Sequence, residues 1–295
     1  MGVVPAAEVV VVGSANLDQV FRVTAIPRPG ETVLSTGFAT AAGGKGQNQA
    51  VAAARAGAST ALIAALGRDA FGDGILAGLE ADGIDSALVR RVDAPTGTAV
   101  IAVDDGGENT IVVQAGANAL LLDLGDDDDA AIRAASHLVM QLEIPLETVL
   151  HAATVAHDNS TVVVLNAAPV RDLPDELLAV VDVLVVNEHE AAMLAPAGDV
   201  AALAPVVIVT LGAAGAVLYR AGAEEARVPA PRVEAVDATG AGDSFCGALA
   251  AALAAGDSLA ASLTFAVTAA SLSVQRPGAV PSIPFRVEID AHRPR

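Results

Sequence analysis

The stretch EVVVVGS, residues 8 to 14, decides the fold class. Its four consecutive valines leave no polar face, and an unbroken β-branched run is typical of a strand that is buried on both faces of a sheet. Ligands of open α/β sheets collect beyond the carboxyl ends of the strands, and here Asn16 and Asp18 follow the run directly. We therefore expect a parallel sheet with functional residues just past this strand.

Further apolar runs alternate with helical patterns along the chain. Each run ends in polar or glycine residues, and the runs are TALIAALG, HLVMQLEIP, TVVVLNAAP, VDVLVVNEHE and VVIVTLGAAGAVLY. This alternation is the pattern of a doubly wound fold. We predict an α/β protein with three layers, α/β/α, around a mostly parallel sheet, and 295 residues are compatible with a single domain, residues 1–295.

Two segments interrupt the alternation and predict a small β flap. Residues 20–38 contain IPRPGE between short apolar runs, and residues 98–113 contain two alternating runs around the turn sequence DDGG. The second pattern is typical of a β-hairpin. We predict that the two pieces, at about residues 17–41 and 97–115, pair into a lid inserted in the domain.

Composition excludes several classes of function. A net charge of −19 and a pI near 4.4 argue against a nucleic-acid surface, because no Lys or Arg cluster could neutralise phosphates. The N-terminus shows no secretory signal, and the apolar stretch 247–274 predicts two helices rather than a membrane span. The only cysteine, Cys246, cannot form an intramolecular disulfide, which fits a reducing compartment, the cytoplasm.

The glycine-rich segments do not match the common nucleotide fingerprints. A P-loop would need a glycine at position 39 and Ser or Thr at position 46, where this chain has Ala39 and Gly46. A GxGxxG dinucleotide motif is missing after Gly13. The histidines show no zinc-ligand spacing. Any phosphate site in so acidic a protein must therefore rely on local backbone dipoles, a cation or a metal.

The stretch VDATGAGDSFCGALAAALAAG, residues 236–256, contains such a dipole. Gly240, Ala241 and Gly242 lead into Asp243, and the Ala-rich run that follows is typical of a helix. A helix start exposes unpaired N–H groups and a partial positive charge, which suits a phosphate. Asp243 itself has two interpretations, a helix cap or a catalytic carboxylate.

Polar residues also follow the other apolar runs, and a doubly wound sheet would bring them to one cleft. They are Asn16, Asp18, Lys45, Asn48, Glu143, Asn187, Glu190, Thr210, Gly212 and Asp243. Asn and Asp side chains suit sugar hydroxyls, which need donors and acceptors at fixed positions. Asn187 and Glu190 share a helix face, where they either hold a hydrated metal on a triphosphate or form an N-cap pair.

Seven motifs in order resemble the ribokinase-like sugar kinase family, which includes phosphofructokinase B-type and adenosine kinases. They are GSANLD at 13–18, GGKGQNQA at 43–50, MQLE at 140–143, NEHE at 187–190, TLGAAG at 210–215, DATGAGDSF at 237–245 and RPGAVPS at 276–282. The similarity extends from residue 9 to about residue 290. It implies an enzyme that uses ATP to phosphorylate the primary 5-hydroxyl of D-ribose.

The resemblance also implies roles for single residues. The sugar-binding set is Asn16, Asp18, Gly44, Lys45, Asn48, Glu143 and Asp243, with Asp243 as the general base. The nucleotide-binding set is Asn187, Glu190, Thr210, Gly212, Gly215, Gly240, Ala241, Gly242 and Val267, with Glu190 acting on Mg²⁺ and the backbone amides of residues 240–243 as the anion hole. The K⁺ set is Asp237, Thr239, Ser273, Arg276, Gly278 and Ser282. Val267 replaces the amide or imidazole that is usual near adenine in this family.

Several alternatives remain open at this stage. A kinase for deoxyribose, a fructose-type sugar or adenosine belongs to the same family, although a nucleoside kinase would be expected to offer more aromatic stacking groups than this chain has. A noncatalytic sugar-binding sensor on the same fold and a nicotinamide dehydrogenase are further alternatives. The resemblance implies a homodimer through the lid.

Overall fold

Strand β1 (Val9–Val12) lies inside the larger of two sheets, as the valine run predicts. In the described part of the computed structural model, residues 6–196 and 198–293, this sheet has nine strands in the order β13-β12-β11-β10-β9-β8-β1-β4-β5. Their bounds are β13 Ala223–Val228, β12 Ala216–Arg220, β11 Val206–Thr210, β10 Val183–Asn187, β9 Val162–Asn166, β8 His137–Met140, β4 Thr60–Gly67 and β5 Val89–Val92. Only the pairs β11–β12 and β12–β13 are antiparallel. The prediction of a mostly parallel sheet is confirmed.

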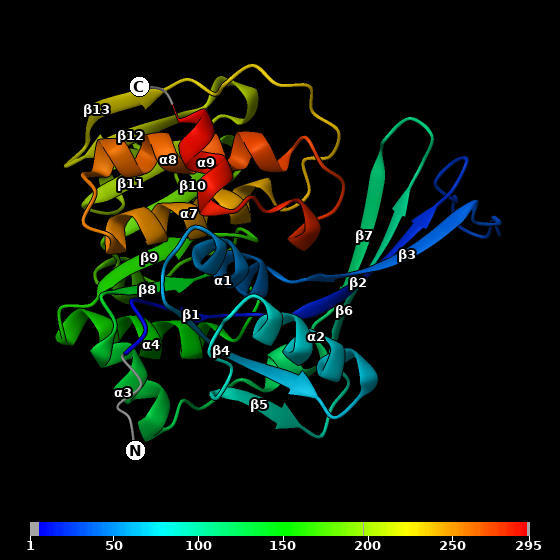
Figure 1. Ribbon diagram of the computed structural model, residues 1–295, viewed down its shortest axis with the longest axis horizontal. Helices are drawn as coiled ribbons and strands as arrows, with labels where there is room; N and C mark the ends of the chain where they lie inside the picture. The colour runs from blue at the N-terminus through cyan, green and yellow to red at the C-terminus, as the bar shows by residue number, and fades with distance from the viewer. Residues whose placement is uncertain (1–5, 197, 294–295) are drawn as a thin grey trace.

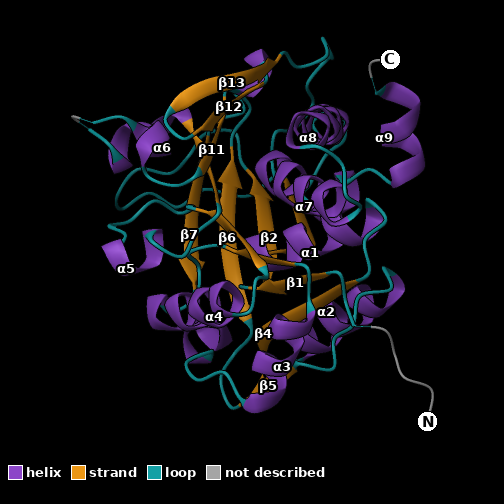
Figure 2. Cartoon of the chain, turned by 90° about the vertical axis from the view of Figure 1, so that its left-hand side faces the viewer, coloured by secondary structure: helices purple, strands orange, loops and turns teal. Residues whose placement is uncertain are grey.

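Helices cover both faces of this sheet (Figure 2). The elements are α1 Lys45–Arg55, α2 Ala70–Ala81, α3 Asp126–Ala134, α4 Leu146–Asp158, α5 Asp175–Leu178, α6 Glu188–Leu194, α7 Ala241–Ala254, α8 Leu259–Ser273 and α9 Arg286–His292, with short 3₁₀ turns at Gly116–Leu120, Val200–Ala202, Gly212–Ala214 and Val280–Ser282. The three-layer α/β/α architecture predicted from the sequence is thereby confirmed.

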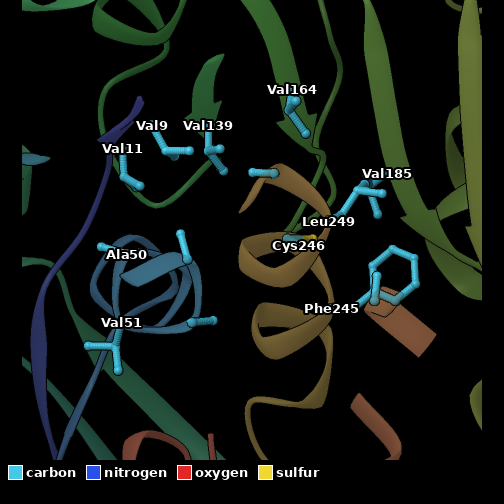
Figure 3. Packing of buried hydrophobic residues seen from close by; sticks show 14 of the residues in the cluster. Val9, Val11, Ala50, Val51, Val139, Val164, Val185, Phe245, Cys246 and Leu249 are labelled. Carbon is cyan, nitrogen blue, oxygen red and sulfur yellow. The ribbon is translucent and has the colours of Figure 1, made fainter. Parts of the chain in front are cut away.

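Alternate residues of β1 belong to two separate cores. Val9 and Val11 pack on the α1 and α7 side, whereas Val10 and Val12 pack on the α3 and α4 side. Figure 3 shows the first core, where Ala50 on α1 and Leu249 on α7 face the strand valines. Because β1 is buried on both faces, no polar residue could be accommodated within it without an unsatisfied group. Small side chains on α1 and α7 let these helices pack directly on the strands and on each other.

The two lid segments pair into a second, four-stranded sheet in the order β3-β2-β6-β7. Its strands are β3 Gly37–Gly43, β2 Asn16–Arg22, β6 Gly97–Val103 and β7 Asn109–Gln114. Figure 1 shows this sheet extending away from the body of the molecule. Strand β2 begins four residues after β1 ends, so the lid continues from the carboxyl edge of the main sheet. Among the described residues, no helix is both long and apolar enough to cross a membrane.

Candidate active site

Asp243 lies in the first turn of α7 and is only 6% exposed. Its Oδ2 accepts a hydrogen bond from Asn48 Nδ2 at 2.9 Å, and its Oδ1 accepts one from Gln49 Nε2 at 2.9 Å. Both donors belong to α1, so the carboxylate joins two helices. The N-cap of α7 is Gly240, which makes no side-chain cap. Among its described contacts, Asp243 therefore does not act as a helix cap.

The charge of Asp243 is balanced by a nearby lysine. Burial raises the pKa of Asp243, and the positive charge of Lys45 opposes this rise. Burial alone would lower the pKa of Lys45, but the negative charges of Asp243 and Glu143 outweigh burial and raise it. Lys45 thus stays protonated and supplies a positive charge in an otherwise acidic protein.

Glu143 follows β8 and is held at one oxygen. Glu143 Oε2 accepts hydrogen bonds from Ser14 Oγ at 2.6 Å and from the Lys45 backbone N–H at 3.0 Å. Ser14 is fully buried, and its Oγ accepts the N–H of Gly46 at 3.3 Å. No partner of Glu143 Oε1 is found among the described residues, so that oxygen is free to accept a hydroxyl.

Asn16 opens β2 and is oriented by a second asparagine. Asn118 Nδ2 donates to Asn16 Oδ1 at 2.7 Å, while Asn118 Oδ1 accepts the N–H of Ala15 at 2.9 Å. The carbonyl of Asn16 is therefore used, and its NH₂ group remains as a donor. Two glycines leave room for it, because a Cβ at Gly97 would lie 2.2 Å from Asn16 Oδ1 and one at Gly44 would lie 2.8 Å from Asn16 N.

Asp18 lies two residues further along β2 and has a strongly shifted pKa. Burial, together with the negative charges of Glu143 and Asp243, raises the pKa of Asp18 to about 6. The three carboxylates therefore lie close enough to repel one another. Gly43 on the paired strand makes room for Asp18, because a Cβ there would be 2.2 Å from Asp18 Oδ2.

We expect replacement of Asp18 by asparagine to increase the free energy of unfolding at pH 7.5 by about 1 to 3 kcal/mol. The folded pKa of about 6 exceeds the unfolded value near 3.8, so the folded protein loses stability as pH rises between these values. The loss of stability caused by ionised Asp18 is complete well above pH 6, and the neutral amide of asparagine avoids this loss. Urea unfolding at pH 5.0 and 7.5 should show a smaller gain at the lower pH, while the exposed control Asp105→Asn should show little gain at either. An equal gain at both values would contradict this origin.

A cavity of about 590 Å³ lies beside the start of α7. Of the residues predicted to bind nucleotide, it is lined by Thr210, Gly212, Gly215, Ala241, Gly242 and Val267. Gly212 has a φ of +53° and faces open space, with no described atom within 4 Å of an added Cβ. Position 215 requires glycine for a structural reason as well, because a Cβ there would lie 1.9 Å from Val228 O. Phe245 and Val274 contribute apolar walls to the same cavity.

One of the backbone amides predicted to form the anion hole at the start of α7 already has a partner in the protein. The Ala241 N–H already donates to Ala238 O at 3.2 Å in a turn. The amides of Gly242 and Asp243 lie in the first helical turn, where N–H groups have no acceptor within the helix. Gly242 also lines the cavity, which brings this helix end to the cavity wall.

Asn187 and Glu190 form a reciprocal capping box at the start of α6. Asn187 Oδ1 accepts the Glu190 N–H, and Glu190 Oε2 accepts the Asn187 N–H, each at 2.8 Å. Of the two interpretations from the sequence, the structure contains the N-cap pair. Neither residue lines the cavity, but the charge of Glu190 contributes to the raised pKa of Lys45, so it lies near the site.

The six residues expected to hold K⁺ come from the segment before α7 and from the segment between the end of α8 and the 3₁₀ turn Val280–Ser282, and Asp237 joins the two segments. Asp237 Oδ1 accepts from Thr239 Oγ1 at 2.6 Å, and its Oδ2 accepts the Gly278 N–H at 2.8 Å. The hydroxyls of Ser273 and Ser282 donate to backbone carbonyls of their own turns, and Arg276 pairs with Glu288. The guanidinium of Arg276 carries no oxygen and is paired, whereas the hydroxyl oxygens and the Asp237 carboxylate keep lone pairs that could accept a cation.

Sequence reasoning missed the residues that orient the site. Ser14, Gln49 and Asn118 are buried and each holds a predicted site residue through a side-chain hydrogen bond. Ser14 and Gln49 lie inside the quoted motifs, so their position was a usable signal. Asn118 lies in a 3₁₀ turn without any pattern that could have identified it.

Comparison with known proteins places the chain among carbohydrate kinases. The family model described as pfkB family carbohydrate kinase matches residues 6–286. The chain is 39% identical to a ribokinase of Schizosaccharomyces pombe, with 96% of each chain covered, and 41% identical to a ribokinase of Bacillus subtilis, with 95% of this chain and 97% of the relative covered. Among solved structures, the ribokinase of Arabidopsis thaliana complexed with ribose and ATP superimposes with a TM-score of 0.90 at 34% identity, over 97% of this chain and 98% of the other.

Proposed function

The chain belongs to the pfkB family of carbohydrate kinases, and we propose that it transfers the γ-phosphoryl group of ATP to the 5-hydroxyl of D-ribose. The observation that carries this proposal is the buried carboxylate of Asp243. It is hydrogen-bonded to Asn48 of the predicted sugar-binding set, and the neighbouring residue Gly242 lines the cavity. The Arabidopsis relative with the same fold was solved with ribose and ATP bound.

The acceptor sugar would bind among the polar side chains at the base of the lid. Asn16 offers an NH₂ donor, Glu143 offers a free carboxylate oxygen, and Asn48 Oδ1 is buried without a partner among the described residues. Asp18 and Lys45 add an acceptor and a charged donor. A small polyol needs such alternating donors and acceptors at fixed positions, because each buried hydroxyl must be satisfied.

The nucleotide would occupy the cavity beside α7. Val267, Thr210 and Gly212 all line this cavity, and the methyl groups of Val267 would pack against the base. The triphosphate would then extend toward the amides of Gly242 and Asp243. These N–H groups and the helix dipole provide local positive potential, which an acidic protein needs in order to accept an anion.

The chemistry requires one proton transfer and one phosphoryl transfer. Asp243 accepts the proton of the 5-hydroxyl as that oxygen forms its bond to the γ-phosphorus, and the bond from phosphorus to the β-phosphate oxygen breaks. The products are ribose 5-phosphate and ADP. The first-turn amides neutralise charge on the transferred group, and the positive charge of Lys45 lowers the pKa of Asp243 against the effect of burial, which favours the ionised form that acts as the base.

We propose that two cations, Mg²⁺ and K⁺, bind near the phosphates of ATP. Within residues 6–196 and 198–293 there is no cluster of three or more His, Cys, Asp or Glu side chains suited to a metal. Mg²⁺ does not require one, because it usually binds through substrate phosphates, water and one or two carboxylates, and Glu190 is the nearby candidate. K⁺ would be held by Asp237 and neighbouring carbonyls. These ions would supply positive charge near the phosphates.

We also propose that the enzyme is a cytoplasmic homodimer that pairs through its lid. Five large apolar side chains on the lid strands are 42 to 67% exposed, namely Phe38, Val100, Ile111, Val112 and Val113. Such an apolar surface is typical of a contact that a partner covers. Light scattering at micromolar concentration should give twice the 29.2 kDa mass of the chain, and a monomeric mass would contradict the pairing.

A coupled assay of ADP release over a sugar panel tests the function. We expect ribose to give the highest kcat/KM, ahead of 2-deoxyribose, fructose and adenosine, and we expect Mg²⁺ to be essential and K⁺ to activate relative to Na⁺. Identification of ribose 5-phosphate as product confirms the transferred position. No sugar-dependent ADP release, or clear preference for adenosine, would overturn the proposal.

A further inference from the structure

A buried amide network extends from Asp243 into the interior of the protein. Gln49 Nε2 donates to both Asp243 Oδ1 at 2.9 Å and Asn166 Oδ1 at 3.0 Å. Gln141 Nε2 donates to Gln49 Oε1 at 2.6 Å. Gln49 and Gln141 are fully buried, and Asn166 is 8% exposed. The network thus joins α1 and α7 to the ends of β8 and β9.

The network leaves Gln49 only one amide orientation. Its nitrogen has two hydrogens and faces two oxygen acceptors, while its oxygen faces an N–H donor from Gln141. A rotation of the amide by 180° would place its oxygen against the Asp243 carboxylate and its nitrogen against another nitrogen. In a buried site neither mismatch is compensated by water. Gln49 therefore presents a donor to Asp243 at all times.

The two oxygens of Asp243 have different surroundings. Oδ1 is bound from the interior by Gln49, whose neighbours are all protein groups. Oδ2 is bound by Asn48, which belongs to the predicted sugar-binding set and whose own Oδ1 is buried with no partner among the described residues. The acceptor sugar consequently approaches from the Oδ2 side.

We propose that Gln49 is a positioning residue for the kinase reaction, which holds Oδ1 of Asp243 so that Oδ2 is the oxygen that receives the proton. This inference depends on the proposed role of Asp243 as the base. Gln49 contacts no substrate in this arrangement and acts only through the carboxylate. A hydrogen bond from a buried amide to an ionised carboxylate also stabilises the ionised form, so Gln49 lowers the pKa of Asp243 against the effect of burial.

Four ionisable side chains also interact with the charge of Asp243 and must stay in place for a clean test. Lys45 on α1 lowers its pKa, and Glu143 after β8 raises it. Asp18 on the lid strand β2 and Cys246 on α7 also interact with its charge. None of these four side chains hydrogen-bonds to Gln49 in the described residues, so a change at position 49 removes none of their hydrogen bonds.

Two substitutions at position 49 separate donor chemistry from shape. Gln49→Met keeps the length of the side chain and removes the donor. Gln49→Glu keeps the shape and the bond from Gln141 but turns an acceptor oxygen toward Asp243. Gln47→Met is the matched control, because Gln47 is a buried glutamine in the same helix without a hydrogen bond to Asp243.

The measurement is the pH profile of kcat with ribose. We expect the midpoint of the acid limb to rise by about one to two pH units in Gln49→Met and further in Gln49→Glu, with activity partly recovered at pH 9. The KM for ribose should change less than about three-fold, since the residue does not touch the sugar. Gln47→Met should leave the midpoint unchanged. A loss of kcat that is equal at every pH would overturn the proposal and indicate a merely structural role.

A second readout does not depend on turnover. Titration of the Asp243 carboxyl by ¹³C NMR, assigned with Asp243→Asn, should show the same upward pKa shift in the free protein. If Gln49→Met does not fold, Gln141→Met offers a milder change, because it frees the Gln49 amide, and we expect a smaller shift in the same direction. An unshifted titration overturns the role of Gln49 even if ribose is phosphorylated normally. Failure of the parent protein to phosphorylate ribose, with the shift present, would instead overturn only the function.

Discussion

Replacement of Asp243 by asparagine is expected to lower kcat for ribose by about 10²- to 10⁴-fold, the range typical of removing a positioned base. The amide cannot accept the hydroxyl proton, while the sugar ligands Asn16 and Glu143 remain in place. KM for ribose should therefore change little, whereas thermal stability should fall somewhat, because the NH₂ group of the new asparagine faces a donor from Asn48 or Gln49. Steady-state kinetics with the coupled assay and calorimetric binding of ribose measure both effects.

The matched control for this variant is Asp126→Asn. Asp126 also lies in the first turn of a helix, α3, but it is exposed, and α3 packs on the face of the sheet opposite to α1 and α7. If a carboxylate at position 243 served only the helix dipole, the two variants would lose stability by similar amounts and keep their activity. Near-normal turnover of Asp243→Asn would remove the assignment of this residue as the base.

Replacement of Gly247 by alanine is expected to destabilise the protein by about 3 kcal/mol or more. Gly247 lies where α7 crosses α1, and a Cβ there would be 2.4 Å from Gln49 O, 2.5 Å from Ala52 Cβ and 2.7 Å from Ala53 N. These neighbours are backbone or short side chains, so a whole helix must move. The helix that moves carries Lys45, Asn48 and Gln49, so kcat should fall as well.

A second glycine in a helix provides the control for this effect. Gly78 in α2 has no described atom within 4 Å of an added Cβ. Gly78→Ala should therefore increase the free energy of unfolding by up to about 1 kcal/mol, because alanine has the higher helix propensity. Urea unfolding of both variants measures the contrast. A Gly247→Ala protein as stable as its parent would show that the crossing is less tight than these distances indicate.

Much of the fold could be predicted because its signals are local. The valine run at residues 9–12 predicts a strand buried on both faces, and the structure places it inside the nine-stranded sheet. The turn DDGG predicts the hairpin of β6 and β7, which the structure contains. Strand β5, with the sequence VRRV, was not identified, because two arginines interrupt the apolar pattern and only its pairing with β4 makes it a strand.

The candidate site was predictable as a set of residue types but not as a set of contacts. The motifs named Asp243, Asn48 and Glu143, yet their hydrogen-bond partners Gln49 and Ser14 were passed over although they lie in the same motifs. Asn187 and Glu190 had two interpretations, and only coordinates could show that they bond to each other. The roles of these residues in binding remain predictions.

By itself, the sequence determined the alternation of strands and helices, the positions of the lid segments and the motifs that define the family. These depend on side-chain periodicity and on short-range turn chemistry, which a linear pattern contains. The tertiary structure alone decided which amide faces which carboxylate oxygen. That choice depends on the packing of α1 against α7, because residues 195 and 194 positions apart in the chain, Asn48 and Gln49 with Asp243, meet only where the helices cross.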